Sequence, residues 1–150
     1  MWLYKGEEFT SEMIEDWIGF VYLITDKDNG MKYVGKKLLT RIAKLPPLKG
    51  KKRKRNVVKE TDRKKYYGSS DTVKLMIEEK GVDNFHREIL YLCKTKGQLG
   101  YLEAKYQFAN DVLLRDDYYN GIIQAKIHRS HVKSLIGLNM DWIELTENNS

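Results

Sequence analysis

Residues 19–35 constrain the fold more than any other stretch of the chain, because they have the pattern of a buried β-hairpin. The segment Gly19-Phe-Val-Tyr-Leu-Ile-Thr25 is rich in aromatic and β-branched residues and is apolar at successive positions, which is typical of a central strand. Asp28-Asn29-Gly30 is a strong turn signal, and Met31-Lys-Tyr-Val-Gly35 then returns as a second strand. The chain therefore has an antiparallel pair against which its other elements must pack.

Three later segments complete the predicted fold. A helix begins at Ser70 or Asp71 and ends at Gly81, residues 85–93 form a third strand, and residues 99–114 form the clearest helix. The last helix has one apolar stripe, made by Leu99, Leu102, Tyr106, Ala109 and Leu113. We therefore predict an α+β fold in which a small three-stranded antiparallel sheet is flanked by helices.

The length of 150 residues is that of one ordinary domain. We expect a single unit, 1–150, with a core of about 19–121, a basic insertion at about 44–65 and a short C-terminal extension. One more helix is expected within residues 122–145.

Two features bear on location. The chain has no apolar run of about 18 residues and no basic segment before an apolar stretch at its N-terminus, so we expect no membrane span and no secretory signal. The single cysteine, Cys93, fits a reducing compartment, and its place at the end of an apolar run favours a small buried side chain over a nucleophile. We expect a cytoplasmic protein.

Positive charge is concentrated in one part of the chain. Fifteen of the 27 Lys and Arg, but only two of the 21 Asp and Glu, lie between Lys32 and Lys65. Such a split predicts a surface for a polyanion, and nucleic acid is favoured over a membrane because the window lacks amphipathic periodicity.

Within this window, six of the seven residues in Lys49-Gly-Lys-Lys-Arg-Lys-Arg55 are cationic, so the segment must be a solvated loop or arm. Contact with phosphates is favoured over a localisation tag or a solubilising loop. The expected DNA-binding residues are Lys32, Lys36, Lys37, Lys51, Lys52, Arg53, Lys54 and Arg55.

Two tyrosines share one face of the predicted hairpin. With a two-residue turn, Tyr33 lies opposite Asp26, which is on the same face as Tyr22, and any even-length turn keeps this parity. Two tyrosines in strands are by themselves ordinary core residues. Lys32, Lys36 and Lys37 flank Tyr33, and nearby cations lower the pKa of a phenol, so Tyr33 is a candidate general base.

Glu103 and Arg41 are the other candidates. Glu103 borders the apolar stripe of its helix, where a carboxylate must be paired or bound to a metal; a structural salt bridge and a Mg²⁺ ligand are the alternatives. Arg41 is a candidate for binding the phosphodiester, because arginine forms bidentate hydrogen bonds with phosphate. An ordinary surface charge is the alternative.

The order of these residues resembles the GIY-YIG nuclease family. Gly19-Phe20-Val21-Tyr22 and Tyr33-Val34-Gly35 resemble the two halves of its signature, with eleven residues from one tyrosine to the other. Arg41 then resembles the family arginine on the following helix, Glu103 the metal-binding glutamate and Asn120 the closing asparagine. Tyr66-Tyr67-Gly68-Ser69-Ser70 is similar to a segment of small, phage-encoded, Seg-like members.

The resemblance implies a DNA endonuclease that uses one divalent ion, Mg²⁺ or Mn²⁺, held by Glu103. Tyr22 or Tyr33 would help to deprotonate the attacking water, Arg41 would stabilise the phosphorane-like charge, and Asn120 would support the glutamate. Arg41 lies only eight residues after Tyr33, nearer than is usual, so Lys44 or an arginine of the basic run is an alternative.

The expected partner is double-stranded DNA, in the cytoplasm of the host cell if the chain is phage-encoded, with a homodimer left open. Homing, restriction, repair and host-DNA degradation are open as biological roles. The competing hypotheses are a non-catalytic nucleic-acid-binding module that uses the basic arm and a structural RNA-associated protein. The presence of Glu103 favours the enzyme, because a pure binder has no use for a lone acid near a phosphate.

Overall fold

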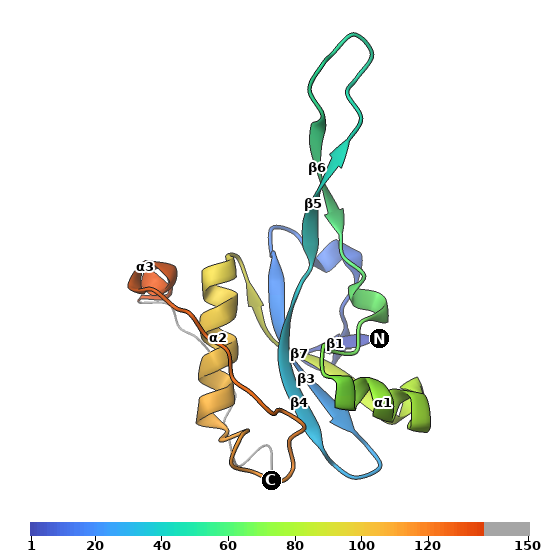
Figure 1. Ribbon diagram of the computed structural model, residues 1–150, viewed down its shortest axis with the longest axis vertical. Coiled ribbons are helices and arrows are strands. Elements are labelled where there is room, and N and C mark those ends of the chain that lie inside the picture. Colours follow the sequence, from blue (N-terminus) through green and yellow to red (C-terminus); the bar gives the residue numbers. More distant parts are fainter. Residues whose placement is uncertain (137–150) are drawn as a thin grey trace.

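A mixed five-stranded sheet forms the centre of the molecule (Figure 1), as seen in a computed structural model that describes residues 1–136. The strands follow the order β2-β1-β7-β3-β4. Their bounds are Trp2–Tyr4 for β1, Glu7–Glu8 for β2, Gly19–Asp26 for β3, Lys32–Leu38 for β4 and Phe85–Cys93 for β7.

The three predicted strands are β3, β4 and β7, and β3 pairs antiparallel with both of the others. The prediction of only three strands is wrong, because the N-terminus adds β1, which runs parallel to β7, and β2. These two strands could not be predicted, because they are too short to show an alternation of apolar and polar residues. In addition, β1 pairs with a strand more than 80 residues away in the sequence.

The hairpin of β3 and β4 keeps the predicted parity with a different register. Its turn has four residues, 27–30, and ends at Gly30 with a positive φ of 74°. Tyr33 consequently lies opposite Ile24 rather than Asp26, while Tyr22 lies opposite Gly35. Because four is also an even number, both tyrosines still emerge on one face of the sheet.

One helix covers each face of the sheet (Figure 1). On the face of Tyr22 and Tyr33 lies α1, Asp71–Lys80, which is capped by the Ser70 side chain and ended by Gly81, as predicted. On the other face lies α2, Lys96–Ala109. It begins and ends earlier than predicted, because Thr95 caps its N-terminus and the chain turns at Asn110. Leu113 is therefore about half exposed outside the helix.

A two-stranded arm projects from the body of the molecule between β4 and α1 (Figure 1). It consists of β5, Thr40–Leu45, paired with β6, Arg55–Glu60. The basic segment occupies its exposed tip. The expectation of a helix directly after the second strand is wrong, since the chain continues as β5, and β-branched residues such as Ile42, Val57 and Val58 favour strands.

The remaining helices are short. They are η1 (Ser11–Met13), η2 (Arg63–Lys65), η3 (Val82–Asn84), α3 (Arg129–Val132) and η4 (Lys133–Leu135). The predicted C-terminal helix is seen only as α3 and η4, and its range beyond residue 136 lies outside the described residues.

Two findings bear on the expected location. In residues 1–136, none of the helices combines the length and the apolarity that a membrane crossing requires. Cys93 is free and buried, as predicted for a packing residue, and burial raises the pKa of its thiol to about 12.

Candidate active site at the edge of the sheet

A cleft of about 260 Å³ opens at the outer edge of β4. Side chains alternate along a strand, so Tyr33 reaches this edge from the α1 face and Lys36 reaches it from the α2 face. The lining residues are Tyr33, Gly35, Lys36, Ser69, Glu103, Gln107, Asn120, Ile122 and Gln124. The structure therefore brings together three of the five predicted catalytic residues: Tyr33, Glu103 and Asn120.

Tyr22 lies beneath the cleft rather than in it. Its side chain is fully buried, and its ring centroid is 6.3 Å from that of Tyr33. A Cβ atom at Gly35 would be only 2.3 Å from the Tyr22 hydroxyl oxygen, so glycine is required at this position of β4. The second half of the signature thus needs its glycine because the tyrosine of the first half lies against it.

The segment after η2 closes over the two tyrosines. Gly68 has a positive φ of 92°, and a Cβ atom there would contact both Tyr22 and Tyr33 at 3.4 Å. The next residue, Ser69, shares a 3.3 Å hydrogen bond with the Tyr33 hydroxyl.

Arg87 of β7 holds this segment in place. Its guanidinium lies between the rings of Trp2 and Tyr67, at 4.7 Å and 4.0 Å, and donates to the Tyr66 carbonyl at 2.7 Å. It also donates to the Lys64 carbonyl at 3.2 Å.

The environment of the tyrosines contradicts one expectation. Burial raises the pKa of Tyr33, and the hydrogen bond with Ser69 offsets this only in part. Burial, followed by the neighbouring Tyr66, raises the pKa of Tyr22 still further. The expected lowering by lysines is wrong, because Lys36 points to the other face and Lys37 is occupied by Asp62 at 2.7 Å.

Glu103 lies two turns into α2 and is 9% exposed. Its Oε1 atom is 3.8 Å from Nζ of Lys36. Burial raises the pKa of the Glu103 carboxyl, and Lys36 opposes this shift. The predicted position at the border of the apolar stripe is confirmed, with the carboxylate turned into the cleft.

The oxygens of this cleft fit a divalent cation. Gln107 follows Glu103 by one helical turn, is 4% exposed, and donates from Nε2 to the Val34 carbonyl at 3.2 Å. Its Oε1 atom is buried and accepts no hydrogen bond from any described residue. A carboxylate and an unsatisfied amide oxygen are ligands that Mg²⁺ accepts. Residues 1–136 contain no cluster of three His, Cys, Asp or Glu that could hold a metal.

Asn120 fixes the edge strand. Its Oδ1 atom accepts a hydrogen bond from the Val34 N–H at 3.0 Å, and its Nδ2 atom donates to the Val34 carbonyl at 2.8 Å. These two bonds imitate the pairing of a neighbouring strand. Asn120 lines the cleft beside Glu103, but its side chain binds β4 rather than the glutamate.

Asp26 anchors the segment that carries Asn120. Its buried carboxylate accepts hydrogen bonds from Lys80 at 2.7 Å, Asn84 at 2.7 Å and Tyr119 at 2.8 Å. Burial by itself would raise the pKa of Asp26, but these donors outweigh burial and lower the pKa to about 2. Since Tyr119 directly precedes Asn120, this carboxylate helps to hold the segment against β4.

Arg41 is not in the cleft. It is exposed on β5, opposite Lys59, at the root of the arm. The alternatives do not reach the cleft either, because Lys44 lies farther along β5 and the arginines of the basic run lie at or near the arm tip. Lys36 is the cation that lines the cleft with Glu103.

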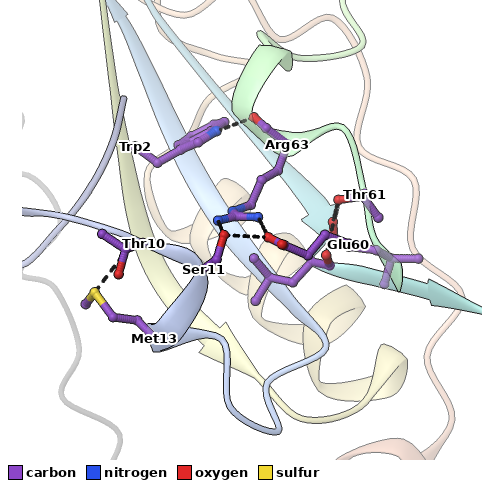
Figure 2. A network of polar contacts seen from close by, with 9 residues as sticks. Trp2, Thr10, Ser11, Met13, Glu60, Thr61 and Arg63 are labelled. Carbon is purple, nitrogen blue, oxygen red and sulfur yellow. Dashed lines mark hydrogen bonds and ion pairs between the residues drawn. The ribbon is translucent and has the colours of Figure 1, made fainter. Parts of the chain in front are cut away.

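The root of the arm is fixed to the body by Arg63 (Figure 2). The buried Arg63 guanidinium binds Glu60 at the end of β6 and approaches Ser11, which itself donates to Glu60 at 2.9 Å. Trp2 Nε1 donates to the Arg63 carbonyl at 2.6 Å. Thr61 Oγ1 donates to the main chain at the end of β4 at 2.6 Å. The arm therefore leaves the body in a defined direction.

The expected DNA-binding cations lie at four different places. Lys36 faces the cleft, whereas Lys37 covers the Tyr66 ring at 4.2 Å and Lys32 lies 3.8 Å from Asp117. The exposed residues near the arm tip are Lys51, Lys52, Arg53, Lys54 and Arg55.

Sequence reasoning missed Gln107 and Arg87, and it quoted Gly68 and Ser69 only as part of a segment similar to Seg-like members, without giving either residue a role. Gln107 had a usable signal, namely its place one turn after Glu103. Gly68, Ser69 and Arg87 act through contacts between segments that are distant in the sequence, which no local pattern reveals.

A comparison with known proteins identifies the family of the chain. The SegE_GIY-YIG family model, which describes the GIY-YIG domain of the endonuclease segE, matches residues 2–123. No curated protein and no solved structure matches the chain. The matched range contains the hairpin, the arm, α2 and all residues of the cleft except Gln124. The chain therefore belongs to the SegE-type family of GIY-YIG endonuclease domains.

Proposed function

We propose that this protein is a divalent-metal-dependent endonuclease that hydrolyses phosphodiester bonds of double-stranded DNA in the cleft at the edge of β4. The observation that carries the proposal is the meeting of Tyr33, Lys36 and Glu103 in that cleft, on the domain of an endonuclease family. A phenol, a cation and a carboxylate supply proton transfer, charge stabilisation and metal binding at one phosphate.

Glu103 and the Oε1 atom of Gln107 would hold the ion, Mg²⁺ or Mn²⁺. When bound, the ion polarises the scissile phosphate and stabilises the leaving 3′ oxygen. Lys36 takes the place beside the phosphate that Arg41 was expected to fill, since it is the lysine beside Glu103. A lysine binds phosphate as a point charge, without the bidentate hydrogen bonds that arginine forms.

Tyr33 rather than Tyr22 contacts the attacking water, because Tyr33 lines the cleft and Tyr22 is fully buried. Its hydroxyl accepts the proton of the water only as the phenolate, and the raised pKa makes that form scarce at neutral pH. Tyr22 and Asn120 are positioning residues: one supports Gly35 from below, and the other holds Val34 at the edge.

The arm supplies affinity for duplex DNA. Its tip is exposed and cationic, its root is fixed, and a two-stranded ribbon has a width that the major groove admits. Contacts of this kind are mainly to phosphates and carry little sequence information. A homing endonuclease is the role that we infer for this family member, and a dimer would supply a second cleft for the opposite strand.

The test is the conversion of supercoiled plasmid in the presence of Mg²⁺. We expect wild-type protein to nick or linearise the plasmid, and we expect Glu103→Ala or added EDTA to abolish the reaction. Glu79→Ala, at an exposed position of α1, is the matched control and should cut like wild type. If the wild-type protein binds plasmid without cutting it in any metal, the non-catalytic binding module replaces the nuclease.

A further inference from the structure

Two further hollows lie between the catalytic cleft and the arm. The second hollow, of about 400 Å³, shares Lys36 with the cleft. A third hollow, of about 680 Å³, shares Leu38 and Lys96 with the second. The three hollows therefore adjoin one another in a row, from Glu103 to the root of β5 and β6, and we call this row the groove.

The lining of each outer hollow combines three cations with apolar side chains and contains no acid among the described residues. Lys36, Lys37 and Lys96 line the second, and Arg41, Lys94 and Lys96 line the third. No Asp or Glu is among the described residues that line either hollow. In the same part of the chain, 1–136, Lys96 and Arg41 form no ion pair within 4 Å, so both charges are available to a ligand.

The helix α2 contributes side chains to all three hollows. Lys96, Gly100 and Glu103 are spaced by four and three residues and therefore lie on the same side of the helix. Lys36 lies close to this side of the helix, because its Nζ atom would be 3.7 Å from a Cβ atom placed at Gly100. The seven residues between Lys96 and Glu103 correspond to about 10 Å along the helix axis.

We propose that one strand of the DNA duplex lies along this groove, from the cleft to the root of the arm, with Lys96 and Arg41 bound to its phosphates. The proposal rests on the nuclease function above and adds the direction that the substrate takes from the cut. Successive nucleotides of a strand advance by about 3.4 Å along the duplex, so Lys96 reaches a phosphate within about three steps of the cut, and Arg41 one farther along.

The groove also explains the position of Arg41. Sequence reasoning placed this residue at the reacting phosphate, whereas the structure places it beyond Lys96 on the way to the arm. Its guanidinium then positions the strand at a distance from the reaction.

The experiment measures binding without cleavage, by fluorescence anisotropy of a short labelled DNA duplex in EDTA. Lys96→Gln and Arg41→Gln are compared with Lys74→Gln, a matched change at an exposed position of α1 on the opposite face of the sheet. We expect each groove variant to weaken binding about three- to tenfold near 0.1 M salt and to lower the slope of log K against log salt by about 0.9, the value for one phosphate contact. Lys74→Gln should change neither quantity.

The double variant Lys96→Gln with Arg41→Gln should lower the slope by about 1.8, because two separate phosphates are released. Unchanged slopes for both single variants, or an equal loss for Lys74→Gln, would overturn the proposed path. The binding experiment needs no turnover. A wild type that shows the Lys96-dependent slope but leaves plasmid uncut supports the groove and refutes the nuclease.

Discussion

Gln107 follows Glu103 by one turn of α2, and its buried Oε1 atom accepts no hydrogen bond from the residues that the structure describes. The Nε2 atom cannot exchange places with this oxygen, because it donates to the Val34 carbonyl at 3.2 Å. An unsatisfied oxygen costs about 1–3 kcal/mol when it is buried, so a ligand that satisfies it is expected.

This relationship predicts the metal affinity of two variants. Gln107→Leu, which keeps the volume and removes the oxygen, should weaken Mn²⁺ binding about tenfold, in line with the loss of one supporting group of a metal site. Gln107→Glu should retain or strengthen it, because a second carboxylate replaces the amide. Mn²⁺ titration followed by electron paramagnetic resonance gives both affinities without cleavage. Equal affinity of wild type and Gln107→Leu would remove Gln107 from the metal site.

The raised pKa of Tyr33 predicts an alkaline profile for cleavage. A phenolate base becomes more abundant as pH rises, and burial places the pKa above the ordinary value of about 10. The rate should therefore increase about tenfold per pH unit through the neutral range, with no plateau below about pH 9.

The matched pair Tyr33→Phe and Tyr22→Phe separates the two tyrosines. Tyr33→Phe should reduce the rate by about 10²–10⁴, the contribution of a general base, and should flatten the profile. Tyr22→Phe keeps the buried ring and should retain both most of the rate and the slope. Cleavage by Tyr33→Phe with an unaltered profile would exclude Tyr33 as the base.

The contact between Gly35 and Tyr22 predicts a large loss of stability. In Gly35→Ala, the new methyl group would be 2.3 Å from the hydroxyl oxygen of Tyr22, whose side chain is fully buried. Overpacking of this kind costs about 3 kcal/mol. Gly121→Ala is the control, because a Cβ atom there meets nothing within 4 Å. Urea unfolding should show a lower midpoint for Gly35→Ala alone; two equal midpoints would contradict the tight contact.

The lowered pKa of Asp26 predicts acid sensitivity. Its value of about 2 lies below the ordinary 3.8, so ionised Asp26 stabilises the fold fully above pH 4–5. That stability, about 2 kcal/mol, is lost as pH falls from about 4 toward 2. Asp26→Asn should remove this part of the pH dependence of the free energy of unfolding. If wild type and Asp26→Asn lose stability in parallel over that range, Asp26 is not the responsible group.

Much of the fold was predictable because its signals are local. The turn at Asp28-Asn29-Gly30, the Ser70 cap and the Gly81 stop each act within a few residues, and each is found where the sequence predicts it. Even turn length preserved the shared face of Tyr22 and Tyr33 although the register differed. Glu103 was found because a carboxylate beside an apolar stripe breaks the helical pattern.

The errors concern pairings between distant segments. The strand β1 forms through β7, which follows it by more than 80 residues, and no periodicity in three residues reveals that partner. Arg41 was assigned by its order in the sequence, but β5 pairs with β6 and carries it out along the arm. The unsatisfied Oε1 atom of Gln107 could not be predicted either. The Gln107 amide is oriented by its hydrogen bond to the Val34 carbonyl, and only folding brings these two groups together.

We predict that replacing Lys96 by an acid changes protein stability and DNA binding in opposite directions. Lys96 occupies the first position of α2, whose first turn contains no acidic residue, although the partial positive charge there favours acids. Lys96→Glu should therefore raise the stability of the protein by about 1 kcal/mol and its Tm by about 3 °C. The same change should weaken duplex binding more than Lys96→Gln does, because it adds repulsion from phosphate. Thermal unfolding and anisotropy on one preparation measure both effects. If Lys96→Glu is more stable and binds DNA as tightly as the wild type, Lys96 does not contact a phosphate. If Lys96→Glu is more stable but binds DNA more weakly, Lys96 contributes to DNA binding although it lowers the stability of α2.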